Sequence, residues 1–226
     1  MDRPAIDLPS RLLLNLKPWR NAATWRIAFS GGLDSTVLLH LLAHLAKTQS
    51  LPALSAIHVH HGLQAVADAW PEHCRSVCAA LGVPLHIVRV QVQPGASLER
   101  AARDARYAAF SAATQANDVL LTGQHRDDQA ETLLFRLLRG AGVRGLSGMP
   151  ATRALGQGSL VRPLLDVTRA ELEAYAQDHG LRWVEDPSNQ DRQFSRNYLR
   201  HQVMPLLTER WPVSYTHLTL PTNREV

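Results

Sequence analysis

The sequence has few cysteines and no long apolar run. Only Cys74 and Cys78 occur among 226 residues, so neither a disulfide-stapled fold nor a cysteine-rich zinc site is expected, and the two thiols suit one buried helix face. The longest apolar stretch, residues 37–46, is interrupted by His40 and His44 and is shorter than the ~20 residues of a membrane span. We expect no membrane partner. The first residues lack a signal-peptide pattern, so the cytoplasm is the expected location.

Lysine is also scarce. Lys17 and Lys47 are the only lysines among 24 Lys and Arg residues, against 20 Asp and Glu, and the formal net charge is +4. Arginine forks match phosphate oxygens, which favours a polyanionic partner such as nucleic acid. A codon bias of the genome is the alternative explanation, because Ala and Leu are abundant as well. With 45% hydrophobic and 19% charged residues, the composition excludes a disordered chain.

Short apolar runs alternate with helical patterns along the chain. Strands are predicted at 25–29, 53–60, 85–92, 118–122 and 160–162, and helices from about 37 and over 68–81, 97–117, 127–139, 168–179 and 195–207. Strands that are separated by helices of this length pair in parallel. We therefore expect an α/β fold, a Rossmann-like parallel sheet with helices on both faces.

The strongest motif joins the first predicted strand to the first helix and reads Ser30, Gly31, Gly32, Leu33, Asp34 and Ser35. Open α/β sheets bind ligands at this edge. Consecutive glycines let backbone N–H groups turn toward one point, and the helix N-terminus adds partial positive charge, so a phosphate is expected there. The two serines can donate hydroxyls, and Asp34 suits the Mg²⁺ that accompanies ATP. The alternative is an ordinary glycine turn with Asp34 as an N-cap.

Two further polar clusters follow strands at the same edge. His58 and His60 lie on one face of the second predicted strand, which favours packing near an adenine or a phosphate. Metal binding and a structural role are the alternatives. Asp127 and Glu131 share a helix face beside Asp128, where carboxylates can hold Mg²⁺ or the ammonium of an amino-acid substrate. The helix dipole alone also favours acidic residues in a first turn.

Several motifs occur together and in a recognisable order. They are SGGLDS, HVHHGL, HRDDQAETLLFRLLRG, GLSGM, RPLL, EDPSNQD and RNYLRHQVMPLL. SGGLDS resembles the PP-loop of the ATP pyrophosphatases, and the collinear set over residues 26–211 resembles the tRNA(Ile)-lysidine synthetases. The resemblance implies ATP-dependent ligation of free L-lysine to C2 of the wobble cytidine of an isoleucine tRNA. An adenylated cytidine would form with loss of pyrophosphate, and lysine would then displace AMP to give lysidine.

The resemblance also implies roles for single residues. The roles are catalysis for Asp34, Asp127 and Asp128; ATP binding for residues 30–35, His58 and His60; Mg²⁺ binding for Asp34; L-lysine binding for Asp127, Asp128 and Glu131; and AMP or tRNA phosphate contacts for Arg162, Arg196 and Arg200. For the last two arginines, a solvated helix face is the alternative.

The resemblance divides the chain into a leader over 1–24, a PP-loop catalytic domain over 25–211, and a tail over 212–226 of doubtful origin. The C-terminal tRNA-binding domains of the family are not expected here, and a homodimer stays open. Three alternatives to the lysine ligase remain. A PP-loop tRNA thiolase would need cysteines at the site, a small-molecule amidating ligase would lack HRDDQAET, and an idle fragment would bind ATP without turnover.

Overall fold

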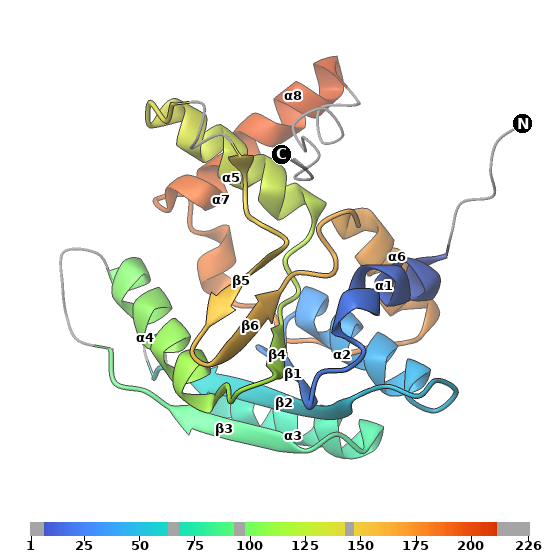
Figure 1. The fold of residues 1–226 in the computed structure, drawn as a ribbon. Helices are drawn as coiled ribbons and strands as arrows, with labels where there is room; N and C mark the ends of the chain where they lie inside the picture. The colour runs from blue at the N-terminus through green and yellow to red at the C-terminus, as the bar shows by residue number, and fades with distance from the viewer. Residues whose placement is uncertain (1–6, 63–67, 93–97, 143–146, 212–226) are drawn as a thin grey trace, which may run out of the picture.

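A six-stranded sheet forms the centre of this computed structural model, which describes residues 7–62, 68–92, 98–142 and 147–211 (Figure 1). The strands, in the spatial order β3-β2-β1-β4-β6-β5, are β1 (Thr24–Ala28), β2 (Ala53–His60), β3 (Leu85–Arg89), β4 (Asp118–Leu121), β5 (Thr152–Leu155) and β6 (Gly158–Val161). Four neighbouring pairs are parallel, and β5 pairs with β6 in antiparallel fashion. The α/β fold and its mainly parallel sheet are thus confirmed.

The antiparallel edge strand β5 is absent from the sequence prediction. Its residues, Thr-Arg-Ala-Leu, are exposed except for Leu155, so the segment lacks the apolar alternation by which a strand is recognised. It forms because its backbone pairs with that of β6, with Thr152 opposite Val161. This short, polar strand ends the sheet at its outer edge.

Helices cover both faces of the sheet. The main core cluster receives residues from α1 (Leu8–Leu16), α2 (Leu33–Leu45), α3 (Trp70–Leu81) and α6 (Arg169–Asp178), whereas α4 (Leu98–Ala113) contributes Phe110 to a second cluster. Strand β4 shows the two faces directly, because Val119 and Leu121 belong to the first cluster and Leu120 to the second. Helix α2 is buried over most of its surface, which explains its Leu-rich sequence.

Helix α1 lies within the segment that the sequence analysis assigns to a leader. Leu12 and Leu16 are fully buried in the main core cluster, and the Asp7 carboxylate caps the helix by accepting the Ser10 N–H at 2.8 Å. Arg11 donates to the carboxylate of Asp166 at 3.2 Å. Residues 8–16 are therefore packed onto the domain, and residues 1–6 lie outside the described part of the chain.

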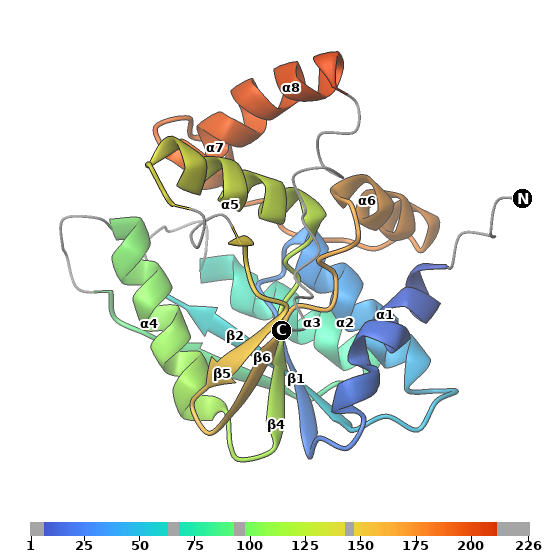
Figure 2. The same cartoon turned by 45° about the horizontal axis from the view of Figure 1, so that its top comes forward.

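The remaining helices stand beyond the carboxyl ends of the strands. They are α5 (Arg126–Leu138), α7 (Ser195–Tyr198), the π-helical turn η5 (Leu199–Val203) and α8 (Met204–Arg210). Figure 2 shows α7 and α8 on the side of α5 that faces away from the sheet. The single helix predicted over 195–207 is thus interrupted by a π-helical turn. The predicted tail and residues 143–146 of the Gly-rich loop fall outside the described residues.

None of the helices in the described ranges combines the length and the apolar character that crossing a membrane requires.

Candidate active site

Residues 30–35 form the turn between β1 and α2. Gly31 has a φ of +87°, and a Cβ added there would lie 3.1 Å from Cγ2 of Val184 and 3.2 Å from Sγ of Cys74, so a side chain is excluded. The Ser30 and Ser35 hydroxyls lie 3.0 Å apart. Helix α2 begins after Gly32 without a side-chain cap. Its first N–H groups are therefore directed at the turn, as an anion site requires.

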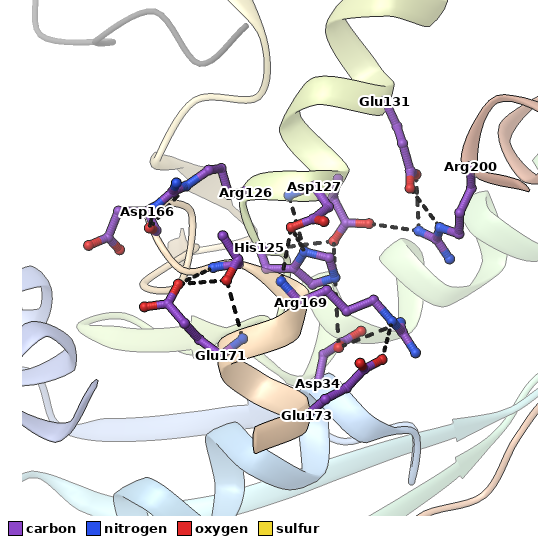
Figure 3. A network of polar contacts seen from close by, with 12 residues as sticks. Asp34, His125, Arg126, Asp127, Glu131, Asp166, Arg169, Glu171, Glu173 and Arg200 are labelled. Carbon is purple, nitrogen blue, oxygen red and sulfur yellow. Dashed lines mark hydrogen bonds and ion pairs between the residues drawn. The ribbon is translucent and has the colours of Figure 1, made fainter. Parts of the chain in front are cut away.

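Asp34 lies in the first turn of α2, close to the end of β4. A Cβ on Gly123 would come within 3.0 Å of the Asp34 carbonyl carbon, so the two segments are in close contact. Oδ1 of Asp34 is buried without a hydrogen-bond partner among the described residues. It lies 3.7 Å from Nε2 of His125 and 4.0 Å from Nη1 of Arg169 (Figure 3). Burial raises the pKa of Asp34, although these two cations oppose it.

His125 is the N-cap of α5 and lies at the centre of the site (Figure 3). Nδ1 of the buried ring accepts the Asp127 N–H at 3.2 Å, and the Asp128 carboxylate accepts the His125 N–H at 3.1 Å. Nε2 lies 3.7 Å from both Asp34 Oδ1 and Asp128 Oδ2. Burial lowers the pKa of His125, but the bond to Asp127 and the neighbouring charges outweigh it, so the pKa is raised. His125 thus joins the turn of residues 30–35, which we call the phosphate turn, to α5.

Asp127 connects α5 to the start of α6. Its Oδ2 accepts the backbone N–H of Arg169 at 2.9 Å and lies 3.4 Å from Nδ1 of His125. Burial raises the pKa of Asp127, but these two contacts outweigh it and hold the pKa below its usual range. The Arg169 side chain also donates to Glu173 at 2.8 Å. Asp127 is therefore an ionised carboxylate that is held by a backbone N–H and lies beside the His125 ring.

Arg200 belongs to the π-helical turn η5 and lies over the carboxylates of Asp128 and Glu131, which together with Asp127 form the acidic face of α5. Nε donates to Oε1 of Glu131 at 2.6 Å, and Nη2 donates to Oε2 of Glu131 at 3.0 Å and to Oδ1 of Asp128 at 3.1 Å. The Glu131 side chain is only 3% exposed, and burial raises the pKa of its carboxyl group against the opposing effect of Arg200. Such π-helical turns often occur at functional sites. An internal cation thus occupies the predicted lysine-binding face.

The structure places His58 beneath the phosphate turn. Its Nδ1 donates to the Phe29 carbonyl at 2.9 Å and lies 3.4 Å from Sγ of Cys74, and the ring is 2% exposed. The predicted partner residue His60 has Nε2 at 3.2 Å from the Asp68 carboxylate. The two histidines share a face of β2, as the alternation predicts. His58 contacts the last residue before the turn, whereas His60 points to the start of α3.

The three predicted phosphate-contacting arginines are separated in the structure. Arg162 is buried, and it donates to Oε1 of Gln124 at 3.1 Å and to the Pro150 carbonyl at 2.6 Å. Arg196 donates to the Thr132 hydroxyl at 2.7 Å. Of the three, Arg200 is the one that hydrogen-bonds to the carboxylates of Glu131 and Asp128. The sequence pattern placed all three near an anion, but in the structure each is bonded to a group of the protein.

Two residues of the site have no role in the sequence analysis. His125 stands inside the quoted motif HRDDQAET, and its position before a predicted helix was a signal for an N-cap. Arg169 lies inside the capping box formed by Thr168 and Glu171. This pattern predicts a helix start but no contact with Asp127. That contact joins residues 42 positions apart, so no local pattern could reveal it.

The strand–turn–helix phosphate site, with an acidic helix start beside it, defines an α/β nucleotide-binding domain. A model of the PP-loop domain family matches residues 7–207. The chain belongs to this family. It is 85% identical over 218 residues to the tRNA(Ile)-lysidine synthase of Pseudomonas fluorescens, covering 96% of this chain and 49% of that protein. With the tRNA(Ile)-lysidine synthase of Coxiella burnetii it shares 47% identity over 217 residues, covering 95% and 48%. The chain thus spans about half the length of the curated relatives it matches.

Solved structures share the fold at low sequence identity. A U34-tRNA thiolase, NcsA, from Methanococcus maripaludis with its 4Fe-4S cluster superposes with a TM-score of 0.74 at 18% identity, over 93% of this chain and 75% of that one. The NMN synthetase of Francisella tularensis has a TM-score of 0.54 at 12% identity, over 98% and 100%. These likenesses establish the fold.

Proposed function

We propose that this domain catalyses the ATP-dependent ligation of L-lysine to C2 of the wobble cytidine of an isoleucine tRNA. One observation carries the proposal: a phosphate-binding turn and a cation-binding carboxylate cluster meet at His125, whose Nε2 lies 3.7 Å from Asp34 Oδ1 and from Asp128 Oδ2. A ligase of this kind needs a nucleotide and an ammonium group side by side. The 85% identity to a tRNA(Ile)-lysidine synthase supports the same activity.

The first step would make C2–O of cytidine a leaving group. The C2 oxygen attacks the α-phosphorus, the bond to the β-phosphate breaks, and pyrophosphate departs. Residues 30–35 would bind the phosphates through the two serine hydroxyls and the first N–H groups of α2. The backbone donors are fixed before the reaction because the turn is held by its own hydrogen bonds. The Ser35 hydroxyl, which donates to the Gly32 carbonyl at 3.0 Å, would exchange that bond for one to a phosphate oxygen.

Asp34 fits one ligand of Mg²⁺. Its Oδ1 is a buried carboxylate oxygen without a hydrogen-bond partner in the described part of the chain. The described residues contain no cluster of three or more His, Cys, Asp or Glu that could hold a metal ion alone. Phosphate oxygens and water would therefore complete the coordination, as is usual for Mg²⁺ with ATP. When bound, the ion would neutralise charge on the departing pyrophosphate.

The second step would join the ε-nitrogen of lysine to C2 while the C2–O bond breaks and AMP leaves. Asp128 and Glu131 would bind the lysine ammonium, because they already hold a guanidinium at 2.6 to 3.1 Å. Lysine must then displace or share this position with Arg200. The nitrogen must also lose a proton before it attacks, and the carboxylates of Asp128 and Glu131, which would hold the ammonium, are the acceptors next to it.

Sulfur transfer is disfavoured by the chemistry of the two cysteines. Cys74 and Cys78 are buried on α3, and burial raises the pKa of Cys74 to about 12 and that of Cys78 to about 11. Thiolates, which are the reactive and metal-binding form, are thus suppressed at neutral pH. This observation argues against a thiolase, despite the fold shared with one.

The test is incorporation of labelled lysine into an isoleucine tRNA transcript that carries a wobble cytidine. We expect incorporation that requires ATP, together with exchange of label between pyrophosphate and ATP that requires the tRNA. Replacing the wobble cytidine by uridine is the matched control and should abolish both signals. Incorporation of labelled sulfur from sulfide in place of lysine would support a thiolase, and ATP binding without exchange would identify an idle domain. Either result contradicts the proposal.

Glu131→Gln tests the lysine site separately. Losing one charged hydrogen-bonding partner should raise the KM for lysine about tenfold or more, with little change in the KM for ATP. Steady-state incorporation assays at varied lysine and varied ATP measure the two constants. Glu72→Gln, on the exposed surface of α3 beside Arg75, is the control and should change neither. If both constants rise together for Glu131→Gln, the residue serves the nucleotide or the scaffold and not lysine.

A further inference from the structure

An open cavity of about 380 Å³ continues along α5 from the carboxylate cluster. Its lining is strongly basic and contains an aromatic ring: Arg103, Thr132, Phe135, Arg136, Arg139, Ala141 and Arg196. The sequence analysis assigns a role to only one of these residues, Arg196, and the proposed chemistry uses none of them. Among the described lining residues there is no carboxylate. We call this feature the arginine cavity.

Two of its guanidinium groups are stacked on aromatic rings. Cζ of Arg139 lies 5.2 Å from the centroid of the Phe135 ring, and Cζ of Arg103 lies 4.9 Å from that of Tyr107. Stacking orients a guanidinium through its face and leaves the N–H donors at its edge available for phosphate oxygens. Arg196, by contrast, donates to the neutral Thr132 hydroxyl at 2.7 Å. The cavity therefore combines oriented positive charge with a ring surface, which suits a nucleobase and its phosphates.

The arginine cavity adjoins the candidate active site through α5. Thr132 follows Glu131 directly, and Phe135 lies one helical turn further, about 6 Å along the axis from Glu131. The hydrogen bonds from Arg196 to Thr132 and from Arg200 to Glu131 both connect the α7–η5 segment to α5. An RNA strand with one base at the carboxylate cluster would consequently continue over Phe135.

We propose that the arginine cavity binds single-stranded RNA next to the reacting base. A neighbouring base stacks on Phe135, and backbone phosphates contact Arg103 and Arg139. The proposal rests on the proposed function for the identity of the RNA, a tRNA anticodon strand. It commits to RNA rather than an acidic peptide because a ring beneath a guanidinium recognises a base as well as a charge.

The experiment measures binding of the full chain to a fluorescent single-stranded RNA of about eight nucleotides with a central cytidine, across a salt series. Phe135→Ala should weaken binding about tenfold and leave the salt slope unchanged, because stacking releases no counterions. Arg139→Ala should weaken binding and lower the slope by about 0.7. Phe135→Trp should keep the affinity of the parent, and Arg139→Lys should keep its salt slope. Arg75→Ala, on the exposed surface of α3, is the charge control and should change neither.

Three outcomes overturn the proposal. They are unchanged affinity in Phe135→Ala, an unchanged slope in Arg139→Ala, and displacement of the RNA by an acidic peptide as effectively as by unlabelled RNA. Thermal unfolding is measured for each variant, and if Phe135→Ala does not fold, the comparison of Phe135→Trp with Arg139→Ala decides. RNA binding that depends on these residues without lysine incorporation would support the arginine cavity and contradict the proposed function, so the two failures are distinguishable.

Discussion

The phosphate turn and the acidic start of α5 meet at His125, yet they are built in opposite ways. In the turn, the side-chain hydrogen bonds join neighbours, Ser30 to Ser35 and Ser35 to Gly32, although the Gly31 carbonyl also accepts the Val184 N–H at 2.9 Å. At the start of α5, the side-chain carboxylates are bonded to residues far along the chain, Asp127 to Arg169 at a separation of 42 and Glu131 to Arg200 at a separation of 69. The side-chain contacts of the turn are thus local, whereas those of the acidic face depend on the tertiary fold.

This difference predicts how each region responds to change. A local turn keeps its geometry when one side chain is altered, so its substitutions should affect chemistry and leave stability intact. The acidic face holds Glu131 and Asp128 against the guanidinium of Arg200 in a buried position. Removing this cation takes away the guanidinium that bonds Glu131 and leaves Asp128 with its contacts to His125 alone, so substitutions there should affect stability and chemistry together.

The largest effect is expected for Asp34→Asn, which tests the local half of the comparison. It removes an electrostatic partner of the departing pyrophosphate and should lower the rate of lysine incorporation by roughly 10²–10³. The free energy of unfolding should stay the same or rise, because Oδ1 has no hydrogen bond to lose and burial raises the pKa of Asp34. Incorporation assays and urea unfolding measure the two quantities. Asp104→Asn, an exposed carboxylate on α4, is the control. An incorporation rate near that of the parent would contradict the role of Asp34.

The same difference explains what the sequence could reveal. The phosphate turn was predictable because its strand, glycines, serines and helix are contiguous. The acidic face was predictable as a set of carboxylates, since Asp127 and Glu131 are one helical turn apart. Its cation Arg200 was not, because a contact across 69 residues carries no local pattern, and the sequence predicts a phosphate contact or a solvated helix face for that residue. What was missing is the position of η5 over α5.

Prediction of the fold from the sequence has the same limit. The parallel strands β1 to β4 follow from buried apolar runs, and α2 follows from its leucines. Strand β5 escaped prediction because its stability comes from pairing with β6 and not from an apolar face of its own. Helix α1 was not predicted because Leu12 and Leu16 are recognised as core residues only from their contact with the main core cluster.

Arg200→Ala tests the long-range half of the comparison. Removing the guanidinium that bonds Glu131 and Asp128 should lower the free energy of unfolding by about 2 kcal/mol, less than for a fully buried pair because the Arg200 side chain is 29% exposed. Urea unfolding at neutral pH measures the loss. Arg196→Ala is the matched control, because Arg196 donates to the neutral Thr132 hydroxyl and acts on Glu131 through its charge without a hydrogen bond to that carboxylate, and it should cost about 1 kcal/mol or less. Equal losses would show that the carboxylates do not depend on Arg200.

The two regions are also connected through α2 and α6. Asp34 lies in the first turn of α2 and Arg169 begins α6, and further along these helices Nδ1 of His40 lies 2.9 Å from the Tyr175 hydroxyl. The His44 ring is 4.1 Å from that of His40 between centroids, and the His179 ring is 5.3 Å away. This contact holds the helix of the phosphate turn against the helix that binds Asp127.

The smallest expected effect is a loss of stability in mild acid that depends on this contact. Burial, and then the charges of His44, His179 and Lys47, lower the pKa of His40 to about 4, against about 6.5 in the unfolded chain. Unfolding therefore takes up a proton below pH 6.5, so the stability that neutral His40 contributes is present above that pH and is lost as the pH falls toward 4. Between pH 7 and pH 5 the parent should lose on the order of 1–2 kcal/mol more unfolding free energy than His40→Gln. His86→Gln, at an exposed position of β3, is the control and should behave like the parent. Equal losses in the parent and in His40→Gln would show that the His40 contact does not couple α2 to α6 in a pH-dependent way.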